Sequence, residues 1–442
     1  MAAGRTLNVL LITVDSLRAD HLGCYGYRHD TTPNIDALAS DGALAEQFFC
    51  SAIPTHPSYT TLYTGQHAIK HKIVAHAGTN VLSREAPFLS ELFMEAGYTT
   101  CAADNLMRAR PWFGRGYEFY IDSSIRRPLV VNVNCEDINA RIIPWLRGHA
   151  MEPFFLFLHY WDPHYPFTPP RSYRHLFYEG NDPTDPNNHT LDPWWDHPFG
   201  MIARDTWLRT PDGPITDPDY VISLYDQEIR YLDDHLPKIL DTLDDLGLTE
   251  NTLVLLLADH GESMIEHGIF FEHHGLYDCV LHIPMIARLP GRIPKGLRIS
   301  KILQMQDVAP TLLDAAGLPI PSEMDGRSFW PILIGETKEG AYDRVISLES
   351  SWMSKWSLRT DRNKLILSRV QDFYGKPMRE LYDLEQDPAE EYNLAKEQPE
   401  LLQDMEKELE GWIADRLEAQ GEKRDPLLDH GISLLEGNWD DT

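Results

Sequence analysis

The sequence is poor in cysteine, and the few cysteines it has are badly placed for structural chemistry. Five occur among 442 residues, namely Cys24, Cys50, Cys101, Cys135 and Cys279. Their number is odd, they are widely spaced, and none belongs to a Cys-x-x-Cys pair. This pattern argues against a disulfide framework and against a zinc ribbon, so we expect reduced thiols in or near the core.

Basic residues are also scarce. Lys and Arg number 39 against 68 Asp and Glu, which gives a formal net charge of −29. Such an excess repels phosphate backbones and anionic lipid, so we expect neither nucleic acid nor a membrane surface as a partner. An anionic substrate would need a local positive charge or a bound metal.

The sequence also lacks long apolar runs. No stretch approaches the roughly 18 apolar residues that a membrane helix requires. The first apolar run, VLLITV, ends at Asp15 and is too short and wrongly flanked for a signal sequence. We therefore expect a cytoplasmic protein.

What the chain does contain is an alternation of strand-length apolar runs with helix-period segments, which predicts an α/β fold whose parallel sheet is covered on both faces. The predicted strands are Asn8–Val14, Tyr98–Ala103, Leu129–Val133, Pro153–His159, Thr252–Ala258 and Pro284–Leu289. The predicted helices are Pro33–Ser40, Pro87–Ala96, Glu136–Arg147, Asp219–Leu246, Asp307–Ala316 and Pro399–Gln420.

The pattern changes twice along the chain. Residues 170–219 are rich in Pro, Asp, Asn and Trp without a clear period, which is typical of an insertion loop near a site, of an oligomer contact or of a solvated insertion. After residue 343 short predicted strands precede a final amphipathic helix. We therefore divide the chain into a catalytic domain, 1–343, and a smaller C-terminal α+β subdomain, 344–442.

Acids and a histidine follow two of the predicted strands, where open α/β sheets place their ligands. Asp15 closes NVLLITVD, and Asp259 and His260 follow TLVLLLA. Oxygen and imidazole ligands suit zinc or manganese. A helix cap is the simpler role for Asp15, although Ser16 is equally able to cap.

Hydroxyl and imidazole groups gather at other predicted loops. The segment 55–65, THPSYTTLYTG, reads as a turn entering a helix, where Thr55 is either a capping group or a nucleophile in a positive field. Asp162 and His164 follow another strand, and His273 and His274 lie downstream of His260. Although some neighbours arise by chance among 19 histidines, this grouping favours a metal or phosphate site.

Seven segments in order resemble the sulfatase branch of the alkaline phosphatase superfamily. They are NVLLITVDSLRADHLGCYGY, TTPNIDALASDG, THPSYTTLYTG, FLFLHYWDPHYPF, LADHGESMIEHG, DVAPTLLDAAGLPIPSEMDGRSFWPIL and ELYDLEQDPAEEYNLA. The resemblance implies an alkaline-phosphatase-like α/β sandwich with a mostly parallel central sheet flanked by helices. It also implies a divalent metal held by Asp15, Thr55, Asp259 and His260, with Thr55 as the nucleophile.

The sequence departs from the main sulfatase pattern where the chemistry is decided. That pattern has Cys or Ser, oxidised to formylglycine, where this chain has Thr55, and threonine cannot be converted in this way. Tyr59 stands in place of an arginine, Asn105 in place of a lysine that contacts sulfate, and His273 falls on or beside a second substrate lysine. Because Ser16 replaces a carboxylate of the calcium site, we favour zinc or manganese over calcium or magnesium, with one or two ions per chain.

A metal-bound threonine resembles instead the phosphodiesterase and phosphoethanolamine-transferase branches. We therefore predict a metal-dependent hydrolase of small-molecule phosphate esters, a phosphodiesterase or phosphonate monoester hydrolase, that forms a covalent phosphothreonine on Thr55. His164 and His273 are candidates for proton transfer and, with Tyr59 and Asn105, for substrate binding. Asp162, His164 and His274 are candidate ligands of a second metal, and the sequence does not choose between the roles of His164.

Three alternatives stay open. The protein is a sulfuric ester hydrolase that uses an unmodified Thr55, a non-catalytic protein that retains the fold, or a transferase that passes the phosphoryl group to another acceptor. The aromatic residues of the insertion either stack on substrate or bury a subunit contact in a homo-oligomer. They are Trp194, Trp195, Phe199 and Trp207.

Overall fold

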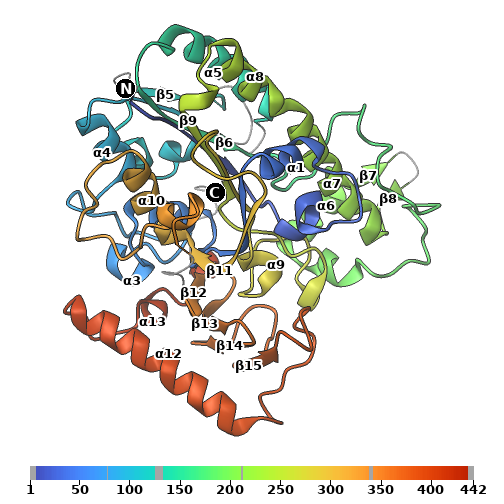
Figure 1. Cartoon of the computed structure of the whole chain (residues 1–442). Coiled ribbons are helices and arrows are strands. Elements are labelled where there is room, and N and C mark those ends of the chain that lie inside the picture. Colours follow the sequence, from blue (N-terminus) through green and yellow to red (C-terminus); the bar gives the residue numbers. More distant parts are fainter. Residues whose placement is uncertain (1–5, 77, 125–132, 211–212, 338–341, 437–442) are drawn as a thin grey trace.

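An eight-stranded sheet runs through the middle of the computed structural model, which describes residues 6–76, 78–124, 133–210, 213–337 and 342–436 (Figure 1). The strand order is β11-β2-β10-β9-β1-β6-β4-β5. All neighbours pair in parallel except β10, which is antiparallel to both β2 and β9. The bounds are β1 Asn8–Val14, β2 Ala43–Phe49, β4 Thr99–Ala103, β5 Phe119–Ile121, β6 Phe154–Tyr160, β9 Thr252–Ala258, β10 Met285–Arg288 and β11 Leu297–Gln304.

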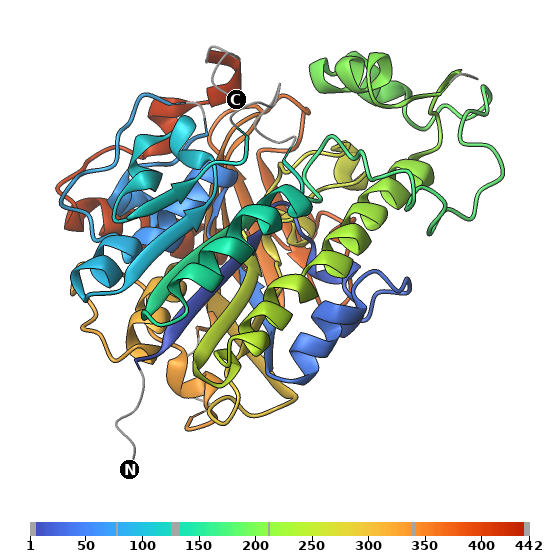
Figure 2. The ribbon, with the colours of Figure 1, turned by 90° about the horizontal axis from the view of Figure 1, so that it is seen from above.

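Helices cover both faces of this sheet, as the alternating pattern predicts. One group packs together on the face turned toward the reader in Figure 2: α1 Pro33–Ser40, α5 Cys135–His149, α7 Pro218–His235 and α8 Pro237–Asp245. A second group contains α2 Thr55–Thr64, α4 Leu89–Glu95 and α10 Val308–Ala315. Shorter helices are α3 Ala68–His71, α9 Asp278–Leu281 and α11 Trp330–Leu333.

A second sheet has the order β15-β14-β13-β12-β3. Its strands are β3 Ala52–Ile53, β12 Arg344–Ser350, β13 Ser354–Thr360, β14 Asn363–Ser368 and β15 Arg379–Asp383. The last four form an antiparallel meander, and α12 Pro399–Ala419 packs against it through Met405, Leu409 and Ile413. The remaining helices are α13 Pro426–His430 and α14 Ser433–Glu436.

The short strand β3 joins the two parts of the chain. It pairs in parallel with β12, Leu348 opposite Ala52 and Glu349 opposite Ile53. The second sheet is therefore built from residues 344 onward together with a strand that lies two residues before Thr55.

The insertion, residues 170–219, extends away from the main sheet (Figure 2). It contains α6 Pro198–Asp205 and two very short strands, β7 Arg209–Thr210 and β8 Gly213–Pro214. Trp194 is buried against Phe271 with ring centroids 5.0 Å apart, and Trp207 packs edge-on against Phe167. These contacts anchor the insertion to the body of the protein.

Several predicted bounds match and others need correction. β1, β9 and α1 have the predicted bounds. The helix predicted over 219–246 is two helices, α7 and α8, because Pro237 has no backbone N–H to continue the first. The sequence patterns missed β2, β11, β12 and β13, and residues 129–132 of one predicted strand lie outside the described residues.

All five cysteines are free, and within the described ranges no helix is both long and apolar enough to span a bilayer.

Candidate active site

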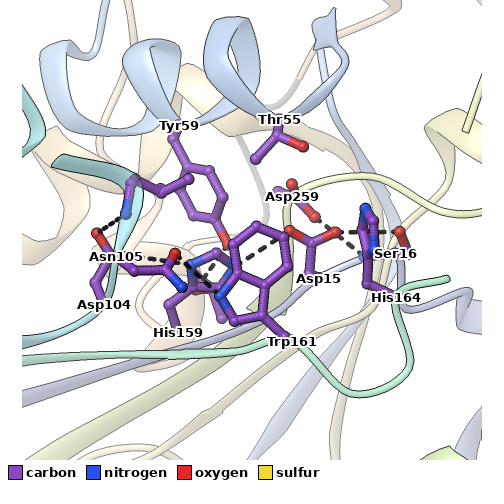
Figure 3. Close-up of polar contacts among 12 residues, drawn as sticks. Asp15, Ser16, Thr55, Tyr59, Asp104, Asn105, His159, Trp161, His164 and Asp259 are labelled. Carbon is purple, nitrogen blue, oxygen red and sulfur yellow. Dashed lines mark hydrogen bonds and ion pairs between the residues drawn. The ribbon is translucent and has the colours of Figure 1, made fainter. Parts of the chain in front are cut away.

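The carboxyl ends of β1 and β9 bring two carboxylates together. The strands pair in parallel with Val14 opposite Ala258, so Asp15 and Asp259 leave the sheet side by side, both fully buried (Figure 3). The backbone N–H of Ser16 donates to Asp259 Oδ1 at 3.2 Å. Ser16 has φ +58°, a left-handed conformation that non-glycine residues rarely adopt and that is often found at functional sites.

His260 completes a cluster that fits a divalent cation. Its Nδ1 lies 2.9 Å from the carbonyl oxygen of Gly261 and must therefore carry the proton, which leaves the Nε2 lone pair free. That Nε2 lies 3.2 Å from Asp259 Oδ2 and 4.0 Å from Asp15 Oδ1. The three ligand atoms all lie within 4.8 Å of one another, and the buried Asp259 Oδ2 accepts no hydrogen bond. Two carboxylates and a neutral imidazole are a donor set that suits zinc or manganese.

Thr55 is the first residue of α2, and its hydroxyl faces this cluster. Its Oγ1 lies 3.2 Å from His260 Nε2. The helix N-terminus supplies unpaired backbone N–H groups and a partial positive charge near the hydroxyl. Ser58, one turn on, donates from Oγ to the carbonyl oxygen of Asp259 at 2.7 Å, which fastens α2 to the end of β9.

The pKa values of the two carboxylates are shifted in opposite directions. Burial and the neighbouring Asp15 raise the pKa of Asp259 well above its usual value. Burial also opposes ionisation of Asp15, but His164, His159 and His260 outweigh it and lower the pKa of that carboxyl. Two buried carboxylates this close cannot both ionise without a counter-charge, and a divalent cation supplies one.

His159, on β6, lies behind Asp15 and faces two carboxylates. It is fully buried, with Nε2 3.2 Å from Asp15 Oδ2 and Nδ1 2.8 Å from Asp104 Oδ1 (Figure 3). Although burial opposes protonation, these two carboxylates raise the pKa of His159 to about 9. Our sequence reasoning missed this residue; the signal was a single histidine inside the apolar strand PFFLFLHYW.

Tyr59 and Asn105, predicted to bind substrate, lie behind the cluster. Tyr59 is fully buried and donates from its hydroxyl to Thr13 Oγ1 at 3.0 Å. Asn105 accepts a hydrogen bond from Trp161 Nε1 at 3.2 Å (Figure 3). These contacts give both residues a role in holding the inner wall of the site.

Two of the predicted second-metal ligands are directed elsewhere. Asp162 Oδ2 accepts a hydrogen bond from the backbone N–H of Cys135 at 2.7 Å and so caps the start of α5. His274 has its Nδ1 3.2 Å from Glu349 and its Nε2 3.5 Å from Glu272. Carboxylates thus face both nitrogens of His274, which leaves neither directed at the Asp15 cluster.

His164 and His273 do lie beside the cluster. His164 Nδ1 lies 2.5 Å from the carbonyl oxygen of Tyr165, so this nitrogen donates and Nε2 is left free. His273 stacks on His260 with ring centroids 4.6 Å apart, and its centroid is 5.4 Å from that of His164. Burial opposes protonation of His273, yet Glu262 raises its pKa to about 9.

This fold and this arrangement define a class, the hydrolases that act on ester bonds in an alkaline-phosphatase-like α/β framework. The chain belongs to the sulfatase family, whose model, described as Sulfatase, matches residues 7–318. A second model, described as N-sulphoglucosamine sulphohydrolase, C-terminal, matches residues 265–415.

Curated relatives match over most of their own length. Iduronate 2-sulfatase of Mus musculus is 25% identical over 74% of this chain and 72% of its own. Delta 4,5-hexuronate-2-O-sulfatase of Bacteroides thetaiotaomicron is 24% identical over 88% and 85%. The arylsulfatase of Clostridium perfringens is 26% identical over 88% and 90%.

Solved structures share the fold. The phosphonate monoester hydrolase of Agrobacterium radiobacter has a TM-score of 0.73 and 22% identity, covering 93% of this chain and 96% of its own. An enzyme solved in complex with its substrate D-glucosamine-2-N,6-O-disulfate has a TM-score of 0.77 and 18% identity, covering 96% and 99%. At these identities the likeness is one of fold.

Proposed function

We propose that the protein hydrolyses a sulfate ester of a small molecule and uses the unmodified Thr55 hydroxyl as its nucleophile. The observation that carries this proposal is the position of Thr55 Oγ1, 3.2 Å from the unprotonated Nε2 of His260 within the Asp15 cluster. Curated relatives that are sulfatases along most of their length support the sulfate ester. This choice reverses the order of the sequence-based hypotheses, because none of the relatives named above is a phosphodiesterase.

The reaction runs in two displacements. The Thr55 oxygen attacks sulfur, the bond to the ester oxygen breaks, and the alcohol leaves with a proton. Water then attacks the sulfated threonine, releasing sulfate and restoring the hydroxyl. A divalent cation held by Asp15, Asp259 and His260 would lower the pKa of the Thr55 hydroxyl and balance the charge of the sulfuryl oxygens.

The chain's own residues hold this geometry. The hydrogen bond from Ser58 to the carbonyl of Asp259 fixes the first turn of α2 against the cluster. The two hydrogen bonds of His159 hold the orientation of Asp15. His273, with a raised pKa, is placed to give a proton to the leaving oxygen. His164, whose Nε2 lone pair is free and whose pKa is lowered by burial, is placed to accept a proton.

A phosphate or phosphonate ester is the second candidate substrate, favoured by Thr55 itself. A sulfated threonine lacks the neighbouring hydroxyl through which a formylglycine hydrate expels sulfate, so water must attack sulfur directly. A phosphothreonine meets water at phosphorus, where a metal-rich site stabilises the greater developing charge. Phosphodiesters belong to this candidate.

The deciding experiment compares p-nitrophenyl sulfate, a p-nitrophenyl phosphonate monoester and an aryl phosphodiester on metal-loaded protein, with Thr55→Ala and Thr55→Ser variants. We expect fastest turnover of the sulfate and a loss of at least about 10³-fold in kcat for Thr55→Ala. Thr55→Ser keeps a hydroxyl and is the matched control. Rapid quenching followed by peptide mass analysis identifies a sulfated or phosphorylated Thr55.

The outcomes separate the hypotheses. Faster turnover of a phosphorus ester, with a phosphorylated Thr55, selects the second candidate. Full activity of Thr55→Ala on every ester would overturn both, because each requires the hydroxyl. No activity on any ester, together with no metal bound, would favour a non-catalytic protein.

A further inference from the structure

The loop that carries His273 is held in place on both sides of that residue. Before it, the backbone N–H of Glu272 donates to the carbonyl oxygen of Ser263 at 3.2 Å, and the Ser263 N–H donates to the Glu272 carbonyl at 2.9 Å. After it, the backbone N–H of Gly275 donates to Glu349 Oε2 at 2.9 Å. The first support comes from the segment that follows β9, and the second comes from the second sheet.

Glu349 is a fully buried acid of β12 whose carboxylate is directed at this loop. Its Oε1 lies 3.2 Å from His274 Nδ1 and also accepts a hydrogen bond from the Ser351 hydroxyl. An ionised carboxylate only accepts, so His274 Nδ1 carries the proton. Together with the N–H of Gly275, three donors compensate the buried charge, as an ionised group in a protein interior requires.

The backbone of Glu349 reaches the nucleophile. Glu349 pairs in parallel with Ile53 of β3, which lies two residues before Thr55. The neighbouring Leu348 N–H donates to the carbonyl oxygen of Ser51 at 3.2 Å, so the pairing continues along the strand. One residue thus contacts the nucleophile segment through its backbone and the loop of the proton donor through its side chain.

The ring of His273 depends on this support, because its own contacts are loose. It stacks on His260 with ring centroids 4.6 Å apart, and its Nδ1 lies 3.7 Å from Glu262 Oε2, which is too long for a hydrogen bond. A proton donor must come within about 2.6–3.2 Å of the oxygen that it protonates. A misplacement of about 1 Å can cost on the order of 100-fold in rate, so the anchoring of the loop bears on catalysis.

We propose that Glu349 is a positioning residue that fixes His273 relative to Thr55. Both of its oxygens accept hydrogen bonds from the chain, so it acts through His273 and does not itself exchange a proton with the ester. The second sheet thereby takes part in catalysis, because it sets the place from which the leaving oxygen receives its proton. This role rests on the proposed function, in which His273 supplies that proton.

The dependence of the rate on the leaving group tests this role. Phenyl sulfate needs a proton on its leaving oxygen more than p-nitrophenyl sulfate does, because p-nitrophenolate is the more stable anion. We expect Glu349→Gln to lower kcat at least about 10-fold on phenyl sulfate and less than about threefold on p-nitrophenyl sulfate, with KM little changed. If a phosphorus ester is the better substrate, its phenyl and p-nitrophenyl forms replace the sulfates.

Two further variants guard this test against general damage. Glu380→Gln is the matched control, a buried acid of β15 that contacts Lys355, Tyr277 and Tyr382, and we expect it to keep both rates. His274→Phe breaks the link to Glu349 from the loop side and should show the same leaving-group dependence. Equal losses on both leaving groups in folded protein, or no loss on either, would overturn the role of Glu349.

The position of the His273 ring can also be followed without turnover. In protein labelled with ¹³C-histidine, the nuclear magnetic resonance signal of His273 is identified by its loss in His273→Gln. We expect this signal to move in Glu349→Gln and to stay in place in Glu380→Gln. An unmoved signal in Glu349→Gln would overturn the proposal. If the signal moves but no ester is cleaved by the wild type, the positioning of the ring stands and the proposed function fails.

Discussion

Two regions of this protein bury charge in opposite ways. In the second sheet Lys364 is fully buried with its Nζ 2.8 Å from Asp278 and 2.8 Å from Glu390. Lys355 is buried in the same way between Asp372 and Glu380, at 2.9 and 3.0 Å. At the ends of β1 and β9, by contrast, two buried carboxylates lie side by side and face histidines, with His159 Nε2 3.2 Å from Asp15 and His260 Nε2 3.2 Å from Asp259.

Buried charges that stabilise the fold thus differ from buried charges that form a binding site. A buried charge that serves the fold has a lysine beside it, whereas a cation-binding site places carboxylates next to one another and needs the bound ion to balance their charge. Buried ions alone therefore do not mark an active site, but two buried carboxylates side by side with a histidine do. The following predictions test this contrast.

The largest loss of stability is expected for a buried lysine of the second sheet. Lys364→Met removes one cation and leaves the buried Glu390 without it, whereas the partly exposed Asp278 keeps Arg359 at 3.0 Å. We expect the free energy of unfolding to fall by about 3–5 kcal/mol. Denaturant titration measures this loss. Metal content should stay at the wild-type value, and a stability change below about 1 kcal/mol would show that Lys364 contributes little to the fold.

At the ends of β1 and β9, we expect bound metal to stabilise the protein. Chelation is expected to lower the free energy of unfolding of the wild type by about 3 kcal/mol relative to protein with free metal at about 100 times its Kd. Asp259→Asn removes a ligand, so its thermal midpoint should respond much less to chelator. Calorimetry with and without chelator measures both, and equal responses would show that Asp259 does not hold the ion.

Asp162 is a buried acid near the site whose role is structural, because it caps the start of α5. Burial raises its pKa to about 7, with Asp137 and Glu136 acting in the same direction. The native state keeps this proton while the unfolded chain releases it near pH 4, so its contribution to stability is lost as pH rises from about 4 to 7. Asp162→Asn keeps an acceptor for the Cys135 N–H without the charge.

We therefore expect the stability advantage of Asp162→Asn over the wild type to grow by about 2–3 kcal/mol between pH 5 and pH 8. Thermal unfolding at the two pH values measures this. Metal content should not change. A lower metal content would return Asp162 to the set of metal ligands that the sequence suggested.

The smallest change in stability is expected for a solvent-exposed salt bridge. Lys72 and Glu422 lie 2.6 Å apart with side chains about half exposed. Glu422→Ala should change the free energy of unfolding by less than about 0.5 kcal/mol, because water and salt screen exposed pairs. Denaturant titration alongside Lys364→Met gives the comparison directly.

The sequence predicted five of the eight strands of the main sheet and the acids that follow β1 and β9, because buried strands are seen as apolar runs and an acid that ends such a run stands out. It missed β12 and β13, since the pleat of an antiparallel strand mixes Ser, Lys and Glu with apolar residues. It could not assign Asp162, whose partner Cys135 precedes it by 27 residues. It also could not identify Glu262, because the approach of this buried carboxylate to His273 at 3.7 Å is visible only once both residues are placed.

The pairing of β3 with β12 has a consequence for how the protein is made. Thr55 follows a strand whose partner residues, Leu348 and Glu349, emerge from the ribosome almost 300 residues later. The nucleophile segment therefore stays incomplete through most of translation, and such distant pairing slows folding. A nascent chain stopped before residue 344 would carry Asp15, Thr55, Asp259 and His260 without the strand that positions the hydroxyl, so catalytic competence arrives only near the end of synthesis.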